Sequence, residues 1–177
     1  MSGLDRGISK IEVSLKWAPS PFGEPDTHLD IIAATYQASA PYGNPVDVVH
    51  WDSRSPDGTI YLNRDSKDGR GFGWDEVMTL ELDRLAARYV RVVVGVVIHQ
   101  QGGRRTFAQV RDRGVRLREG YTVLSEGDFG DVLEATAATV GEFTRDDAGA
   151  WAFRPGIHGY DTEPAAFAWI MGSPREA

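Results

Sequence analysis

Three groups of acidic residues, in or beside predicted loops, are the parts of this sequence best suited to bind a cation. The first group is the run Asp26-Thr27-His28-Leu29-Asp30, where the two-residue period of a strand would place Asp26, His28 and Asp30 on one face. Two carboxylates about 4 Å apart repel by about 1 kcal/mol in water and by about 4 kcal/mol at an effective dielectric constant near 20. Such a face must therefore point to water or surround a cation, and the residues leave both alternatives open.

The second group is a loop of twelve residues that begins at Asp65 and ends at Glu76, with glycine at every second position of 69–73. Hard divalent cations need several oxygen ligands, and a glycine-rich loop lets backbone carbonyls turn inward to supply some of them. The loop is not an EF-hand, because Lys67 occupies a ligand position and Arg70 stands where the invariant glycine belongs. It is therefore either an ion site of another kind or a plain surface turn.

The third candidate is Asp52, which directly follows a short β-like segment. It could add a carboxylate to a cation site at the end of that segment. Its alternative role is to initiate a turn through its own backbone, as aspartate often does.

Signatures of catalysis are missing from the sequence. It holds no Gly-x-Ser-x-Gly or His-Glu-x-x-His motif and no phosphate-binding or dinucleotide-binding glycine loop. We interpret His99, which follows the most apolar segment, as an imidazole bonded to the backbone. The spacing of the histidines predicts no local site; they are His28, His50, His99 and His158. A non-enzymatic protein is therefore expected, and a hydrolase that uses His99 with a nearby acid is an alternative that no motif supports.

Composition narrows the class of protein. The chain has 177 residues, of which 41% are hydrophobic, and it carries a formal charge of −7 and no cysteine. The acidic balance disfavours nucleic-acid binding, and the missing cysteines exclude disulfides and thiolate metal sites. We interpret the arginines of 104–118 as partners of acids such as Asp112 and Glu119, rather than as an RNA-binding ridge. With no apolar run long enough to cross a bilayer, the protein is expected to be cytoplasmic and not inserted in a membrane.

Alternating apolar and polar residues predict a mostly β fold. Residues 89–99 are almost continuously apolar and β-branched, which is typical of a strand buried on both faces. Residues 133–143 are ambiguous, because their alanines would also tolerate a helix. The predicted strands are 11–17, 29–37, 46–51, 59–62, 77–82, 89–99, 111–118, 121–124, 133–143 and 150–153.

These elements predict an antiparallel two-sheet β-sandwich with a short C-terminal helix. The run Pro56-Asp57-Gly58 predicts a hairpin between the third and fourth strands. Residues 162–171 read as the helix, with Thr162 as its cap and Pro164 in its first turn. One domain is expected over 1–177, with flexible ends at 1–10 and 173–177.

Five passages, in order, make the sequence resemble the TerD family of tellurium-resistance and stress-response proteins. They are Val13-Ser14-Leu15-Lys16-Trp17, His28-Leu29-Asp30, the run 53–58, the loop around Asp65 and 69–76, and Val97-Ile98-His99 followed by 104–110. The resemblance covers about 11–160 and implies a β-sandwich that binds calcium through acidic loops at one end, with no enzymatic activity. It also implies partners among other Ter-family or membrane-associated stress proteins.

The resemblance places six acidic residues where the family has its acidic loop residues: Asp26, Asp30, Asp52, Asp65, Asp75 and Glu76. This chain departs from the family pattern, because His28 replaces the middle of three acids and Arg70, Phe72 and Trp74 enter the acid-rich loop. Each lost carboxylate lowers the charge that favours calcium. The alternative is a metal-independent interaction module, in which an exposed aromatic loop with Phe72 and Trp74 recognises a protein.

Overall fold

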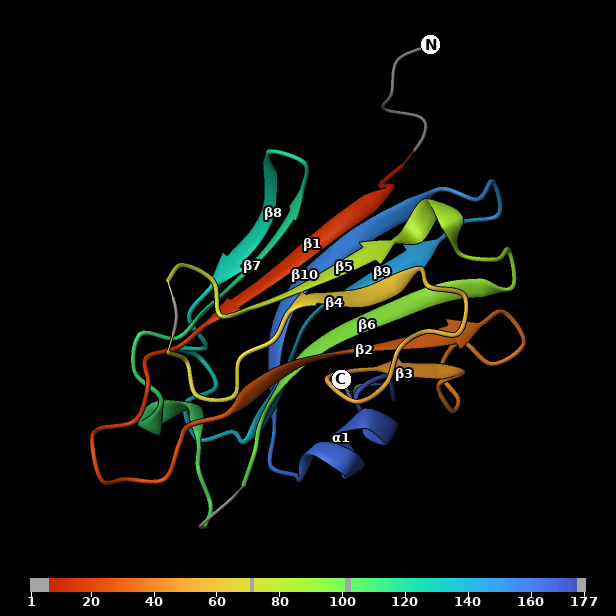
Figure 1. Ribbon diagram of the computed structural model, residues 1–177. Coiled ribbons are helices and arrows are strands. Elements are labelled where there is room, and N and C mark those ends of the chain that lie inside the picture. The colour runs from red at the N-terminus through yellow and green to blue at the C-terminus, as the bar shows by residue number, and fades with distance from the viewer. Residues whose placement is uncertain (1–6, 71, 101–102, 175–177) are drawn as a thin grey trace.

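Two antiparallel five-stranded sheets packed face to face form the protein in the computed structural model, which describes residues 7–70, 72–100 and 103–174 (Figure 1). One sheet has the order β4-β5-β1-β7-β8 and the other β10-β9-β6-β2-β3. The predicted antiparallel sandwich is therefore confirmed. Ile8 N donates to Trp151 O at 3.0 Å.

The strands of the two sheets, two short 3-10 turns and one helix have the following bounds. Short 3-10 turns lie at Leu82–Arg84 and Phe107–Gln109. The first sheet contains β1 (Lys10–Lys16), β4 (Ile60–Arg64), β5 (Glu76–Glu81), β7 (Gly114–Glu119) and β8 (Thr122–Gly127). The second contains β2 (Leu29–Gln37), β3 (Asp47–Val49), β6 (Tyr89–Ile98), β9 (Ala137–Arg145) and β10 (Trp151–Tyr160), and the helix is α1 (Pro164–Ile170).

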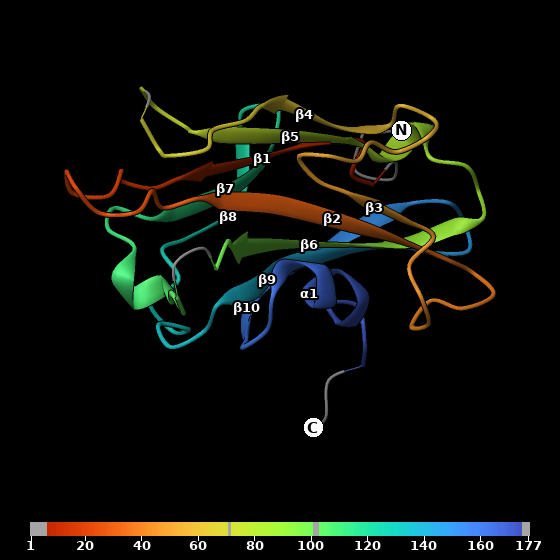
Figure 2. The ribbon, with the colours of Figure 1, turned by 60° about the horizontal axis from the view of Figure 1, so that its bottom comes forward.

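Alternation along the strands builds the core between the sheets. On β1, Ile11, Val13 and Leu15 are fully buried and pack against residues of the second sheet. Strand β6 is buried on both faces, as its apolar run predicts: Val94 belongs to the core between the sheets, whereas Val93 lies on the outer face. The reason is α1, which covers that outer face (Figure 2).

Helix α1 is placed as predicted, but its cap is not. Glu163 is the N-cap and makes no side-chain capping bond, with Pro164 opening the helix. Thr162 lies one residue earlier, where its backbone N donates to Thr136 Oγ1 at 2.9 Å and ties the approach of the helix to β9. The expectation that Thr162 caps the helix is therefore wrong. Phe167 on α1 is fully buried over the second sheet.

The predicted hairpin at residues 53–58 is also wrong. The turn itself forms, with Gly58 at φ +72 and its N donating to Ser55 O at 3.1 Å. However, β3 pairs with β2 in one sheet and β4 pairs with β5 in the other. The turn is therefore a crossing between sheets, because β3 pairs with the strand before it along the chain and β4 with the strand after it, rather than with each other.

Surface arginines pair with acids other than those expected. Arg118 Nη2 lies 2.6 Å from Glu12 Oε1, and Arg104 Nη2 lies 3.2 Å from Asp161 Oδ2. Glu119 instead accepts a hydrogen bond from Ser9 N at 2.7 Å. No helix among the described residues is both long enough and apolar enough to span a membrane.

Candidate metal centre

Three carboxylates from separate segments meet at one end of the sandwich. Asp30 lies near the start of β2, Glu76 is the first residue of β5, and Asp65 directly follows β4. Each offers an oxygen to a group whose ligand atoms all lie within 4.8 Å of one another. The fold thus brings the first acidic group and both ends of the glycine-rich loop together. The loop of 65–75 and the connection from β1 to β2 project from this end in both views (Figures 1 and 2).

The edge of β2 explains how Glu76 reaches the second sheet. Strand β3 pairs with β2 only from Ala33 to Thr35, so it offers no ladder bond to Ile31. Glu76 Oε1 accepts the hydrogen bond of Ile31 N instead, at 2.7 Å. A buried backbone N–H needs an acceptor. The side chain of Glu76 therefore replaces a missing strand partner and links the two sheets.

Two of these carboxylates are fully buried. Asp30 and Glu76 have no exposed surface, whereas Asp65 is exposed. Asp30 Oδ1 and Glu76 Oε2 are buried without a hydrogen-bond partner. A buried carboxylate oxygen without a donor is costly, so these two atoms call for a proton or a cation beside them.

The pKa values follow from this arrangement. Burial, together with the neighbouring charge of Asp30, raises the pKa of Glu76 to about 11. Burial would also raise the pKa of Asp30, but hydrogen bonds with His28 and His99 outweigh it and leave that pKa below its ordinary value. Without a cation, therefore, Asp30 holds the negative charge and Glu76 holds a proton.

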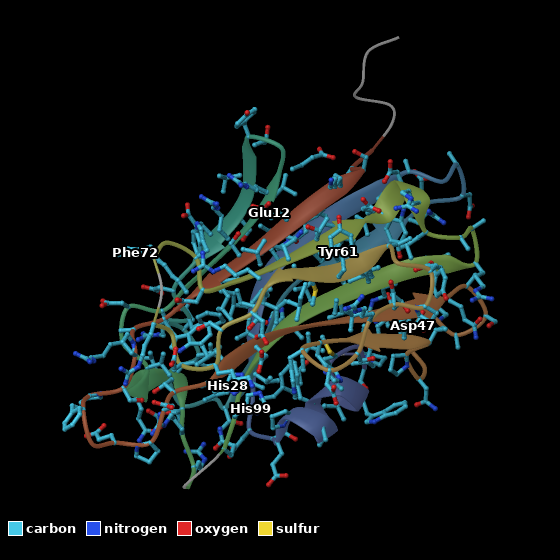
Figure 3. The ribbon with its side chains drawn as sticks, viewed as in Figure 1. Glu12, His28, Asp47, Tyr61, Phe72 and His99 are labelled. Carbon is cyan, nitrogen blue, oxygen red and sulfur yellow. The ribbon has the colours of Figure 1, made fainter. Side chains whose placement is uncertain are left out.

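Two imidazoles, those of His28 and His99, lie beside Asp30, and Figure 3 labels this pair of rings. His28 Nε2 lies 2.9 Å from Asp30 Oδ2, and His99 Nε2 is hydrogen-bonded to the same oxygen. The two rings are stacked, with centroids 4.0 Å apart. The interpretation of His99 as bonded to the backbone through its ring is wrong, and so is the view that the histidines form no local site.

The positions of the two histidines beside apolar strands are the feature of the sequence that points to this pair. His28 directly precedes β2 and His99 directly follows β6, and these strands pair from Leu29↔Ile98 onward. Extending that antiparallel register by one residue sets the two histidines opposite each other, with His99 N donating to His28 O at 2.9 Å. The register between distant strands cannot be read from either segment alone.

The other acidic residues singled out from the sequence lie outside the carboxylate group. Asp75 is buried, and its Oδ2 accepts from Trp17 N at 2.9 Å, while burial raises the pKa of its carboxyl. Asp26 is exposed, with Arg70 Nη2 at 4.0 Å. Asp52 is exposed on the turn after β3, and its backbone N donates to His50 Nδ1 at 3.1 Å.

The glycine-rich loop is anchored at its base and open at its tip. Gly69 has φ +77, and a Cβ there would lie 2.6 Å from Trp17 Nε1, so only glycine fits this approach. Phe72 is 95% exposed. Trp74, expected to be exposed with it, instead lies half-buried beneath the cations of Lys16 and Arg116, 5.0 and 4.6 Å from its ring.

The donor set fits a hard divalent cation. Asp30, Asp65 and Glu76 offer only oxygen, which calcium prefers, and the neighbouring loop can add carbonyls and water. A cation would also supply the missing partner of the two buried oxygens. Exposed Asp65 leaves a route from solvent into the site.

Comparison with known proteins gives the same architecture a family context. The model of the TerD domain matches residues 1–168. Tellurium resistance protein TerD of an Alcaligenes species is 28% identical over 158 residues, which cover 86% of this chain and 82% of that protein. General stress protein 16U of Bacillus subtilis (strain 168) is 28% identical over 172 residues, covering 94% and 89%.

Two solved structures share the fold at higher identity. The crystal structure of SAV2460, a protein of unknown function, has a TM-score of 0.94 at 67% identity and covers 96% of this chain and 99% of that one. A homologue of telluride resistance protein (TerD) from Streptomyces coelicolor A3(2) has a TM-score of 0.93 at 53% identity, covering 95% and 100%. The similarity in sequence and structure therefore extends over nearly the whole chain.

Proposed function

The chain belongs to the TerD family, and from this premise we propose that it is a calcium-binding, non-enzymatic protein of the tellurium-resistance and stress response. Its relatives carry the names of tellurium resistance proteins and of a general stress protein. In this proposal, calcium binds Asp30, Asp65 and Glu76 at one end of the sandwich. The bound ion then controls the order of the glycine-rich loop that partner proteins contact.

One observation carries the proposal: Asp30 and Glu76 are both without exposed surface, and each has a buried oxygen that lacks a partner. A structural ion pair would supply a cationic side chain here. Arg70, a basic residue of the loop, instead lies against Asp26 and Asp68. A divalent cation satisfies both orphaned oxygens and offsets the repulsion that arises between the two carboxylates once Glu76 gives up its proton.

The position of the ligands explains how binding would act on the loop. Asp65 and Glu76 stand at the two ends of 65–76, and Asp30 lies on the opposite sheet. An ion held by all three would join both loop ends to β2. Phe72, at the tip between them, would then be presented from a fixed base.

Thermal unfolding with calcium and with chelator tests the proposal. Saturation at about 100 times Kd adds about 2.7 kcal/mol to stability, which raises the Tm by roughly 5–11 °C for a domain of this size. Asp65→Asn should abolish the shift, because it removes a ligand that is exposed and not needed for packing. Asp52→Asn, on a nearby exposed turn outside the group, is the matched control and should keep it. No shift at millimolar calcium rejects the ion-binding part.

A second candidate, a metal-independent interaction module, is favoured by the fully exposed ring of Phe72. In this case Phe72 contacts another Ter-family or membrane-associated stress protein whether or not calcium is bound. Phe72→Ser should then lose the partner while Asp65→Asn retains it, measured by co-purification of the tagged chain. Loss of the partner in both variants would favour the calcium-dependent mechanism.

A further inference from the structure

We propose that His28, Asp30 and His99 form a second cation site, one that takes a divalent transition-metal ion of the zinc class. The two imidazoles and the carboxylate offer ligand atoms that all lie within 4.8 Å of one another. This group shares only Asp30 with the oxygen group of Asp65 and Glu76. The proposal does not require that calcium bind there.

The backbone places these three side chains together by register. His28 and Asp30 are two residues apart on an extended segment, so their side chains leave the same face. His99 lies opposite His28, one position beyond the pair Leu29↔Ile98, and the backbones join there through His99 N and His28 O. The site therefore lies where two paired strands end, and their backbone pairing holds its three side chains together.

The contacts already converge on one point. His28 Nε2 and His99 Nε2 both face Asp30 Oδ2, while Asp30 Oδ1 remains buried without a partner. The carboxylate itself has no exposed surface, whereas the two imidazoles are 15% exposed. The Asp30 carboxylate is therefore the buried part of the site. The two partly exposed rings lie between it and solvent, on the side from which an ion would enter.

The donor chemistry decides the class of ion. Imidazole nitrogen suits zinc, copper, nickel and iron, whereas calcium and magnesium prefer oxygen alone. Two histidines and one carboxylate, with a water in the fourth position, are a common ligand set of open zinc sites. The two imidazoles therefore give this group a preference for a transition-metal ion over calcium.

Binding requires a small rearrangement of the rings. The imidazoles are stacked with an interplanar angle of 13°, so one ion cannot lie in both ring planes as they stand. Zinc sits about 2.0–2.1 Å from each nitrogen, which needs one ring to turn about its side-chain bonds. The partial exposure of both rings leaves room for that turn. The ion would then take the place of the contacts that both nitrogens make with Asp30.

Two neighbours provide a reporter and a control. Trp51 lies edge-on to the His99 ring, with centroids 4.6 Å apart, so its fluorescence senses an ion bound at His99. The His50 ring also packs against Trp51, with centroids 4.3 Å apart, and its Nδ1 accepts from Asp52 N. His50 is therefore a histidine close to the site but outside its ligand set.

The test is calorimetric titration of the full chain with zinc chloride, after removal of any affinity tag and stripping with chelator. We expect one equivalent of zinc per chain in the wild type. His28→Gln should lower the affinity by about tenfold or more, since loss of even an outer-shell partner costs about 10–100-fold. His99→Gln should do the same, and His50→Gln should leave the affinity unchanged. Quenching of tryptophan fluorescence by nickel should disappear in Trp51→Phe.

The proposal is overturned if the wild type binds no zinc, or if His28→Gln and His50→Gln bind it equally well. Circular dichroism of each variant shows whether it is folded, and His28→Gln carries the test alone if His99→Gln fails to fold. Asp65→Asn separates the two cation sites. It should lose the calcium response and keep zinc binding, and loss of zinc in this variant would contradict a separate imidazole site.

Discussion

Replacement of Glu76 by glutamine should make the calcium-free protein more stable at neutral pH. The glutamine keeps an oxygen to accept the hydrogen bond of Ile31 N, and its amide can face the unpartnered Oδ1 of buried Asp30. It removes a carboxyl group that the calcium-free fold must keep protonated. Glu76→Gln should therefore stabilise the empty site while it destroys the site's use for calcium.

The magnitude follows from the pKa of Glu76, which burial and Asp30 raise from 4.5 to about 11. A raised pKa gives stability that is fully present below 4.5 and is lost as pH rises, because the unfolded chain releases the proton that the folded chain retains. Each pH unit costs about 1.4 kcal/mol. Over the roughly 2.5 units between 4.5 and pH 7, the wild type loses about 3 kcal/mol that Glu76→Gln does not lose.

Thermal unfolding followed by circular dichroism in chelator, at pH 5 and at pH 7, measures the difference. At pH 7 we expect Glu76→Gln to unfold roughly 6–12 °C above the wild type. At pH 5 the two proteins should differ in free energy of unfolding by less than about 1 kcal/mol, because at this pH the wild type has lost little of the stability that depends on the Glu76 proton. Glu134→Gln, at an exposed position, makes the same chemical change and should match the wild type at both pH values.

Two results would refute this reasoning. If Glu76→Gln is less stable than the wild type at pH 7, the side chain is not held as a protonated acid. If its advantage is the same at pH 5 and pH 7, the effect comes from packing rather than from the proton. Either result would remove the electrostatic argument for a cation beside Glu76.

Three further predictions test other parts of the account. Calcium binding should release protons, because Glu76 must give up its proton to become a ligand; a pH indicator in weakly buffered solution should show acidification, and a constant pH would contradict it. Gly69→Ala should lower the free energy of unfolding by about 2 kcal/mol or more in chemical denaturation, since a Cβ at this φ of +77 would meet the Trp17 ring. Gly73→Ala is the control and should lower it by only about 1 kcal/mol, because nothing lies within 4 Å of a Cβ there. Equal losses in the two variants would contradict the steric argument. Phe167→Ala should cost about 3–5 kcal/mol, because its ring fills the space between α1 and the sheet; a loss under 1 kcal/mol in urea unfolding would show that α1 contributes little.

The strands could be predicted from the sequence because each one carries its own pattern. Strand β2 occupies residues 29–37 as predicted, and the two-sided burial of β6 follows from its unbroken run of apolar residues. The local pattern does not specify which strands pair with each other. The turn at residues 53–58 has the composition of a hairpin, yet β3 and β4 join different sheets. Local residues specify the bend, whereas the pairing of β3 with β2 and of β4 with β5 decides which sheets the bend connects.

The candidate site shows the same division. Asp30, Asp65 and Glu76 were identified as acids in loops, and the fold brings them together. Asp26 and Asp52 are also acidic residues in or beside loops, but they are exposed and lie outside the group. The contact of His99 with Asp30 cannot be predicted from local sequence, because it depends on the register of β2 with β6. Residue types predict which chemistry is possible, and the register decides which side chains meet.

A crystal grown with calcium, with anomalous diffraction recorded, tests the central claim most directly. We predict an anomalous peak bonded to oxygen atoms of Asp30, Asp65 and Glu76, with loop carbonyls or water completing the coordination. Full occupancy at these oxygens would establish the cation site. A clear map at millimolar calcium without a peak there, and with Glu76 turned to the same contacts as in chelator, would contradict it.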